Sequence, residues 1–372
     1  MKRLLACFFM LVLLLGLSLP CAAVPPSISA KSAVLMDATT GQVLYQKDAF
    51  VRLPMASTTK IMTALVAIES MALEQEIEVS PNATGIEGSS IYLYPKEKLT
   101  LEALLYALLL ESANDAATAI AIAVAGSVEA FAQKMNTKAE MLGLCNTHFE
   151  NPHGLDGGEH YTTAYDLAKL ASYALKNEMF LKICSTYKTT IPLNTDEGVR
   201  VLVNHNKMLH LYDGAVGVKT GFTKKSGRCL VSAAKRDGLL LVAVTLNAPN
   251  DWSDHTAMLD FGFARYTRVT YAEKGSYQVS LPVVGGNVST LTAVNAEELA
   301  ATLLKTHGKI DCRIEAQRFL YAPIKCGDVV GRIVCLCDGK EIASCDLVAN
   351  EEVTRVPRDG FFARILSIFR KS

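Results

Sequence analysis

Ser57 and Lys60 are the first residues of this chain whose types and spacing could carry out chemistry; they lie in MASTTKIMTAL, residues 55–65. An apolar helical pattern begins there, and residues three apart on a helix are neighbours. A serine hydroxyl is a weak nucleophile at its free pKa and needs an adjacent base. A lysine can be that base only while its amine is neutral, which burial or a second nearby cation favours. The alternative is an ordinary helix start on the surface.

The S-x-x-K spacing is weak by itself, because about one chance match is expected in a chain of this length. Two other matches, Ser185 with Lys188 and Ser232 with Lys235, lead into or lie within β-like segments. Residues three apart on a strand point to opposite faces. Only Ser57 opens a helix, where the positive end of the helix favours a developing alkoxide.

A second cation is offered by Lys219 in VGVKTG, residues 216–221, at the end of a predicted strand. Lys219 and Thr220 could hold a substrate carboxylate. Gly221 has no side chain, so a substrate could approach that strand edge closely. The sequence KSG at residues 225–227 also fits K-[ST]-G, but it is interpreted as a turn and ranks second.

A third segment, ESAND at residues 111–115, lies between two apolar helical patterns. Ser112 could relay a proton and Asn114 could orient an amide. Taken alone the segment would be interpreted as a helix cap, because Ser and Asp are common at helix starts. The three segments are specific when they are taken together and in this order.

S-x-x-K, a Ser/Asn box and K-T-G form the signature of β-lactamases and penicillin-binding proteins. The chain resembles the low-molecular-mass penicillin-binding proteins, specifically the serine D-alanyl-D-alanine carboxypeptidases. Residues 88–90, 151–155 and 161–167 are further family-like segments. The resemblance implies an α+β fold: a serine β-lactamase/transpeptidase-like domain, with an antiparallel sheet packed by helices, followed by a small β-rich, sandwich-like domain.

The resemblance also implies an activity, removal of the terminal D-alanine from peptidoglycan stem pentapeptides through an acyl-enzyme. Ser57 would be acylated, Lys60 would be its general base, and Ser112 would pass a proton to the leaving D-alanine. Asn114 would hold the substrate amide, with Lys219 nearby. β-Lactams would acylate the same serine by mimicking the dipeptide end.

For the rest of the substrate, the resemblance implies that Thr220 binds the terminal carboxylate. The backbone N–H groups of Ser57 and Phe222 would form the oxyanion hole. Phe222 stands where some relatives carry His, and the clamping arginine that follows the last strand in some relatives is missing from residues 247–252. Histidines are given no catalytic role: His153 is interpreted as structural, and nothing is assigned to His205 and His210.

Three other functions remain open on sequence alone. A D,D-endopeptidase would use the same residues. A class A β-lactamase would share the fold but needs an acidic residue for deacylation, and Glu150 and Glu159 lack the surrounding pattern. A non-catalytic wall-binding protein is disfavoured by the intact Ser57, Lys60 and Lys219.

The elements that must position these residues follow from periodicity. Strands at both ends with helices between them predict one sheet built from both ends, an α+β domain over residues 24–271. Short alternating runs with turns predict a β-rich domain over residues 272–355. Strands are expected at 33–37, 42–46, 215–219, 228–235, 239–246, 276–284, 313–316, 329–336 and 341–348, and helices from 57 and at 101–110, 113–125, 131–142, 164–175 and 252–265.

Both ends of the chain carry targeting patterns. Residues 1–23 have two cations, an apolar run and small residues before Val24, as a secretory signal peptide does. The alternatives are a membrane anchor and a lipoprotein signal at Cys21. Residues 356–372 predict an amphipathic helix with a basic face, which can lie in a membrane interface or dock on its own domain. We therefore expect an exported protein, peripheral at the extracytoplasmic face of the membrane or at the cell wall.

Composition excludes some partners. The chain has 372 residues, with 37 Lys and Arg balanced by 37 Asp and Glu, which argues against nucleic acid as a partner. Ten cysteines occur without a C-x-x-C pair, which argues against a zinc site. We expect neither metal nor cofactor, and we interpret most cysteines as small buried hydrophobic residues.

Overall fold

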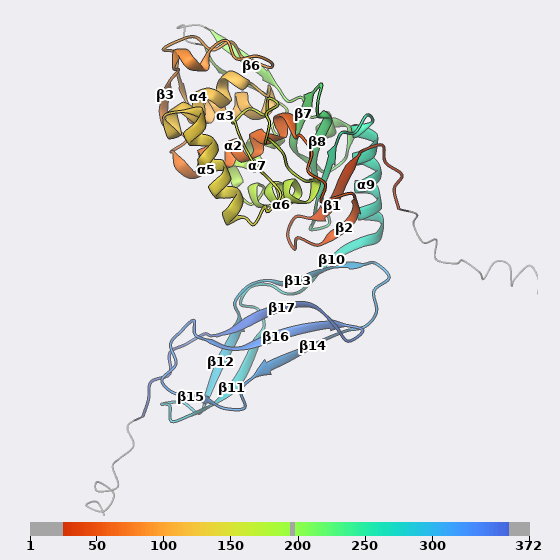
Figure 1. The fold of residues 1–372 in the computed structure, drawn as a ribbon. Helices are drawn as coiled ribbons and strands as arrows, with labels where there is room; N and C mark the ends of the chain where they lie inside the picture. Colours follow the sequence, from red (N-terminus) through yellow and green to blue (C-terminus); the bar gives the residue numbers. More distant parts are fainter. Residues whose placement is uncertain (1–24, 194–197, 357–372) are drawn as a thin grey trace, which may run out of the picture. The chain divides into compact units, whose positions relative to one another are not determined.

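The structure is a computed structural model that describes residues 25–193 and 198–356. The predicted signal peptide and the predicted tail beyond residue 356 lie outside these residues. The described chain forms two compact units, the first ending at Arg265 and the second beginning at Tyr266 (Figure 1).

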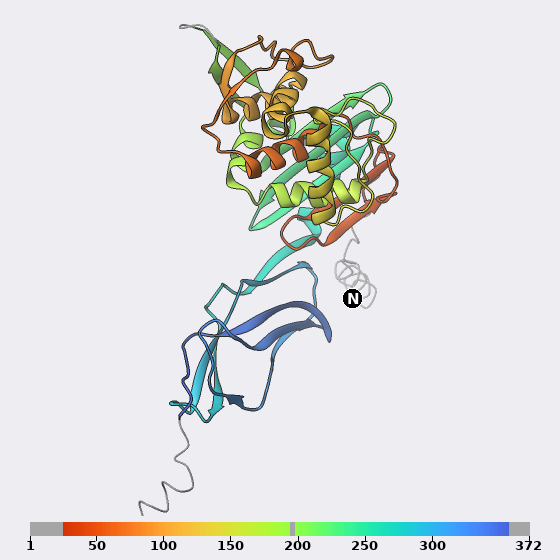
Figure 2. The ribbon, with the colours of Figure 1, turned by 60° about the vertical axis from the view of Figure 1, so that its left-hand side comes forward.

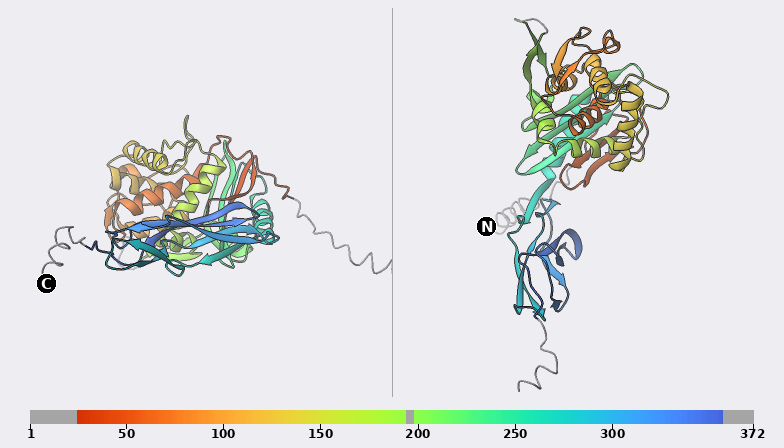
Figure 3. Two further views of the ribbon diagram at one scale, coloured as in Figure 1. Left: turned by 90° about the horizontal axis from the view of Figure 1, so that it is seen from below. Right: turned by 90° about the vertical axis from the view of Figure 1, so that its left-hand side faces the viewer.

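The first unit is built on a five-stranded antiparallel sheet with the order β2-β1-β9-β8-β7. Strand β1 from the start of the unit pairs with β9 from its end, which confirms the prediction of one sheet made from both ends. Strand β9 is buried almost throughout because α9 covers one face of the sheet and α6 contacts the other (Figures 1 and 3). The strands are β1 Ser32–Asp37, β2 Val43–Lys47, β7 Ala215–Thr223, β8 Gly227–Arg236 and β9 Leu239–Leu246.

The helices predicted from periodicity are present, and their ends are set by caps. Thr100, Ser127 and Thr163 each accept a hydrogen bond from a backbone N–H in the first turn of α3, α5 and α6. Helix α3 is apolar on most sides because it packs against α2, α4 and α7. The helices are η1 Ala56–Thr59, α2 Lys60–Ser70, α3 Leu101–Leu110, α4 Asn114–Ala125, α5 Val128–Met141, α6 Ala164–Ala174, α7 Glu178–Ser185, α8 Met208–Leu211 and α9 Asp251–Arg265.

Within the described ranges, no single helix is long and apolar enough to cross a membrane. Helices α4 and α5 pass that test only as a pair, and they are bent by 83° at the break between them.

Two small antiparallel strand pairs flank the helices of the first unit. Strands β3 (Glu76–Glu78) and β4 (Lys98–Thr100) form one pair. Strands β5 (Lys188–Pro192) and β6 (Val199–Val203) form the other. A short 3₁₀ turn, η2 (Pro81–Ala83), follows β3.

The second unit is made of strands, as the alternating pattern predicted (Figure 2). Its six-stranded sheet has the order β14-β16-β17-β12-β11-β15, and β10 pairs separately with β13. A hairpin turn at Asp338 and Gly339 joins β16 to β17. The strands are β10 Tyr266–Ala272, β11 Gln278–Val284, β12 Thr290–Asn295, β13 Leu299–Leu304, β14 Ile310–Ala316, β15 Leu320–Tyr321, β16 Val329–Cys337 and β17 Lys340–Ala349.

The interpretation of most cysteines as small buried hydrophobic residues is wrong in part. Cys312 and Cys335 form a disulfide, because antiparallel pairing of β14 with β16 places them directly opposite each other. Among the other cysteines that the structure describes, three are buried and three reach the surface to some degree: Cys184, Cys229 and Cys345, and Cys145, Cys326 and Cys337.

Candidate active site

Ser57 and Lys60 meet at the junction of η1 and α2, in the first unit. The Nζ atom of Lys60 lies 2.9 Å from Ser57 Oγ. The side chain of Lys60 is fully buried. The structure therefore brings the two residues into the contact that their spacing predicted.

Two further oxygen atoms surround the Lys60 amine. Nζ donates to Asn114 Oδ1 at 2.7 Å and to the backbone carbonyl of His153 at 2.6 Å. Burial holds the pKa of Lys60 well below its ordinary value, and repulsion from Lys219 lowers it further. Asp115 acts in the opposite direction.

Lys219 lies on β7, the edge strand of the sheet, which packs directly against η1. Its side chain is 1% exposed, and burial lowers its pKa to about 7. Its amine donates to the Thr220 carbonyl at 3.0 Å. Lys219 thus lowers the pKa of a lysine that is distant in sequence and that contacts Ser57.

Gly221 lies close to the backbone of the serine turn. A Cβ atom there would lie 2.9 Å from the backbone nitrogen of Ser57 and 3.1 Å from that of Thr58. The space that a side chain at position 221 would need is filled by the backbone of η1. The glycine is needed so that β7 can approach the serine turn.

A cavity of about 370 Å³ opens at Ser57. Ser112, which lies between α3 and α4 with a left-handed φ of 59°, lines it. Of the other residues predicted from the sequence, Thr220, Gly221 and Phe222 line it as well, and the ring of Phe222 is 65% exposed. Residues that line it without having been predicted are Ser89, His205, Lys207, Arg228, Cys229, Asp251 and Trp252.

Asn114 has protein partners at both ends of its side chain. Besides the contact of Oδ1 with Lys60, Nδ2 donates to the carbonyl of Glu87 at 2.6 Å. Its backbone N–H donates to the carbonyl of Ser89. Asn114 therefore links the lysine to the loop that precedes β4, a connection that the sequence pattern did not reveal.

The loop around His153 also supports the serine, through its backbone. A Cβ atom at Gly154, whose φ is +90°, would lie 2.0 Å from the carbonyl oxygen of Ala56. Asn151 Oδ1 accepts hydrogen bonds from the backbone N–H groups of His153 and Gly154. Burial, together with the Lys60 charge and His160, lowers the pKa of His153 to about 3, so its ring is neutral. Its contribution is the carbonyl oxygen, which no side-chain motif predicts.

Arg228 is a cation at the cavity that sequence reasoning missed. It lies at the start of β8, forms an ion pair with Asp251 at 2.9 Å and lies over the ring of Trp252. Arg228 does not follow β9, the last strand of this sheet along the chain; it comes from the preceding strand, β8. Residues 225–227 form part of the turn between β7 and β8, as predicted.

His205 reaches the cavity from the segment after β6. Its Nε2 lies 3.2 Å from Glu111 Oε2. Burial and the Lys219 charge lower the pKa of His205, and Glu111 opposes them. Since the sequence gave this histidine no partner, tertiary structure alone brings it to the site.

Comparison with known proteins agrees with this geometry. A family model described as D-alanyl-D-alanine carboxypeptidase matches residues 20–250, and one described as Penicillin-binding protein 5, C-terminal domain, matches residues 266–355. The D-alanyl-D-alanine carboxypeptidase DacF of Bacillus subtilis (strain 168) is 34% identical over 352 residues, which is 92% of this chain and 90% of the relative.

Solved structures show the same similarity. Penicillin binding protein 5 from Haemophilus influenzae has a TM-score of 0.77 at 27% identity, covering 89% of this chain and 99% of that one. The Streptomyces K15 DD-transpeptidase has a TM-score of 0.61 at 36% identity, and the match covers 64% of this chain and 99% of that one. Because the first family model matches more than half of the sequence, the chain belongs to the D-alanyl-D-alanine carboxypeptidase family of serine peptidases.

Proposed function

We propose that this protein is a D,D-carboxypeptidase that removes the terminal D-alanine from peptidoglycan stem pentapeptides through an acyl-enzyme on Ser57. One observation carries the proposal: the Lys60 amine is buried between two carbonyl oxygens and Ser57 Oγ. A neutral amine has two N–H donors and one lone pair. The oxygens of Asn114 and His153 can only accept, so they take both donors and leave the lone pair for the serine hydroxyl.

Acylation then follows from these positions. Ser57 Oγ attacks the carbonyl carbon of the penultimate D-alanine while Lys60 takes its proton. The bond to the nitrogen of the terminal D-alanine breaks, and Ser112 relays a proton to that nitrogen. Water hydrolyses the ester, which releases the shortened peptide and regenerates Ser57.

The edge strand β7 would hold the substrate. Thr220 and Lys219 bind the terminal carboxylate, and Asn114 orients the amide once the substrate displaces part of its present contacts. The backbone N–H groups of Ser57 and Phe222 stabilise the developing oxyanion, a type of interaction whose loss slows acyl transfer by roughly 100- to 1000-fold.

A β-lactamase is not favoured by the acidic residues of this chain. Glu150 accepts a hydrogen bond from the backbone N–H of Glu159, and in the described structure neither residue lines the cavity at Ser57. β-Lactams are therefore proposed as inhibitors that acylate Ser57 and leave slowly.

The placement of the protein is part of the same proposal. Residues 1–23 act as a signal peptide, the first unit is the catalytic domain, the second unit is a β-rich domain, and residues 356–372 associate with the membrane. The substrate lies in the cell wall, so the protein works as an exported, peripheral enzyme on the extracytoplasmic face.

Incubation with a pentapeptide ending in D-Ala-D-Ala, followed by mass spectrometry, tests the activity through the release of free D-alanine. The Ser57→Ala variant should release none and should not be labelled by fluorescent penicillin. Ser185→Ala is the matched control, because Ser185 belongs to another S-x-x-K sequence and lies at the end of α7. Equal labelling of Ser57→Ala and the wild type would refute the proposal, and turnover of penicillin within seconds would indicate a β-lactamase.

A further inference from the structure

The loop of residues 90–94, SIYLY, presents two aromatic rings to solvent beside the cavity. Tyr92 is 79% exposed and Tyr94 is 58% exposed. Ser89, which precedes the loop, lines the cavity together with Ser57. Three residues of chain span at most about 11 Å, so the Tyr92 backbone lies within that distance of the cavity wall.

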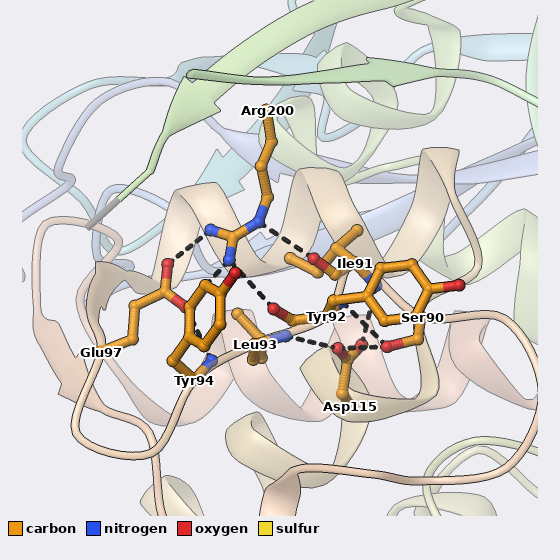
Figure 4. A network of polar contacts seen from close by, with 8 residues as sticks. All are labelled: Ser90, Ile91, Tyr92, Leu93, Tyr94, Glu97, Asp115 and Arg200. Carbon is orange, nitrogen blue, oxygen red and sulfur yellow. Dashed lines mark hydrogen bonds and ion pairs between the residues drawn. The ribbon is translucent and has the colours of Figure 1, made fainter. Parts of the chain in front are cut away.

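Tyr92 has a backbone conformation that bulky residues rarely adopt, with a φ of 57°. Its N–H donates to Ser90 Oγ at 2.9 Å, and its carbonyl accepts from Arg200 at 3.2 Å (Figure 4). Such a conformation persists only where the surroundings hold it, and it is found most often at functional sites. These contacts therefore hold the Tyr92 backbone in an unfavourable conformation, and the Tyr92 ring is exposed to solvent.

Arg200 of β6 fixes the loop from one side. Its guanidinium forms a bidentate ion pair with Glu97, and its Nε donates to the carbonyl of Ile91 at 3.0 Å (Figure 4). Both charged side chains are almost completely buried. The planar guanidinium therefore fixes the direction of the loop as well as its position.

Asp115 of α4 fixes the loop from the other side. Its carboxylate accepts from Ser90 Oγ at 2.6 Å and from the backbone N–H groups of Leu93 and Ile91 (Figure 4). Asp115 follows Asn114, which holds Lys60. The exposed tyrosines are therefore attached to the same helix start as the groups that surround the lysine.

The chemistry of this surface points to an occupant. The cavity is at the small end of ligand sites, so it accepts the reacting end of a polymer-linked peptide while the rest lies outside. The loop carries no charged residue. Tyrosine offers a rigid apolar face with a polar tip at little cost in conformational entropy. An uncharged N-acetylated sugar ring, with C–H groups on its faces and hydroxyls at its edge, matches such a surface.

We propose that Tyr92 and Tyr94 form a platform that binds the glycan strand of peptidoglycan while its stem peptide reacts at Ser57. Arg200 is a positioning residue that holds the platform. This inference rests on the proposed function, because that function places the glycan polymer beside the cavity.

Binding to uncharged, peptide-free strands of N-acetylated amino sugars tests the platform without any reaction. The wild type should bind these strands, and the double variant Tyr92→Ala/Tyr94→Ala should bind at least about tenfold more weakly. The double variant to Phe keeps the ring faces and should bind like the wild type. Tyr321→Ala, which removes an exposed ring from the second unit, is the control. Absence of binding by the wild type, or equal binding by the double Ala variant, would overturn the proposal.

Kinetics separate this proposal from the proposed function. The ratio of kcat/KM for glycan-linked over free pentapeptide should fall about tenfold in the double Ala variant, through KM. Arg200→Ala should lower the same ratio, while penicillin labelling confirms that the variant is folded. An equal loss on both substrates would show a general role in the site and refute a glycan platform. A wild type that binds glycan but releases no D-alanine would refute only the carboxypeptidase activity.

Discussion

Lys60 lies between charges of opposite sign. Lys219 disfavours the ammonium form, and Asp115 favours it. Burial is the larger cause and acts in the same direction as Lys219, so the amine loses its proton at a lower pH than an ordinary lysine does. Since acylation needs that neutral form, the pH dependence of the enzyme should report the surroundings of Lys60 more than those of Ser57.

Lys219→Met removes the like charge while it keeps the length and apolar stem of the buried side chain. The pKa of Lys60 should rise toward its ordinary value, so the amine becomes neutral only at higher pH. The acid limb of the pH profile for acylation by penicillin should therefore shift to higher pH, which stopped-flow labelling can measure. Lys225→Met, in the other K-[ST]-G sequence, is the control. An acid limb that does not move in Lys219→Met would contradict the predicted coupling.

Arg228 lines the cavity at Ser57, and we propose that it offers a second cation to the carboxylate of the substrate. Arg228→Gln should raise KM for a D-Ala-D-Ala peptide by roughly 10- to 100-fold with little change in kcat, as expected for the loss of a charge-assisted hydrogen bond. A peptide with an amidated C-terminus has no carboxylate to lose, so on it the variant and the wild type should have equal KM. Arg236→Gln at the far end of β8 is the control. The same loss on both peptides would show that Arg228 acts only through Asp251 and Trp252.

Residues of the site could be predicted from the sequence where reactive side chains are close to each other along the chain. Ser57 and Lys60 belong to one helix start, so their contact follows from helical geometry. The carbonyl of His153 and the guanidinium of Arg228 come from a loop and another strand, and tertiary structure alone brings them in. Gly221 lines the cavity at Ser57, and the neighbour that leaves no room for a side chain there is the backbone of η1.

At the scale of elements, helices and strands with strong periodicity could be predicted from the sequence, whereas short segments and segments with mixed patterns could not. Helices α3 and α4 and strands β8 and β9 lie within two residues of their predicted bounds. Helix α7 was missed because its eight residues are too few to show a repeat. Strands β12 and β13 were missed as well, and the disulfide depends on a cross-strand register that one sequence does not contain.

His255 attaches α9 to the central sheet. Its ring contacts Ser232 Oγ on β8 and Thr245 Oγ1 on β9, and burial lowers its pKa to about 3. Between pH 6.5 and 3 the unfolded chain binds the proton and the folded chain does not, so stability falls as pH drops below 6.5. This residue alone should remove about 2 kcal/mol from the free energy of unfolding between pH 6.5 and 5.

Urea unfolding at pH 7, 6 and 5 measures this effect, with fluorescence from the single tryptophan, Trp252, which lies on the same helix. His255→Gln should be less stable than the wild type at pH 7 but should lose less stability on acidification. His307→Gln, on the surface of the second unit, should show the same change in the free energy of unfolding with pH as the wild type. If the free energy of unfolding of His255→Gln changes with pH as that of the wild type does, other groups control acid unfolding.

At the scale of the whole molecule, the chain combines a catalytic unit with a β-rich unit that contributes no residue to the cavity at Ser57 among those that the structure describes. The disulfide between Cys312 and Cys335 lies in this second unit. Disulfides persist mainly outside the reducing cytoplasm, so the pair agrees with the export predicted from the first 23 residues. If the protein acts on a polymer in the wall, as proposed, attachment to the membrane surface would keep it near that substrate.

The tail, residues 356–372, is predicted to provide that attachment. In the helix predicted from the sequence, the apolar residues would share one face and the cations the other, so the tail should bind anionic vesicles and be released by salt. Removal of residues 357–372 should leave the protein in the supernatant after vesicle sedimentation, while penicillin still labels Ser57. Leu366→Asp on the apolar face should weaken binding much more than Ser367→Asp on the polar face, although the two changes add the same charge. If both variants bind equally, the attraction is not that of an amphipathic helix, and the predicted attachment is wrong.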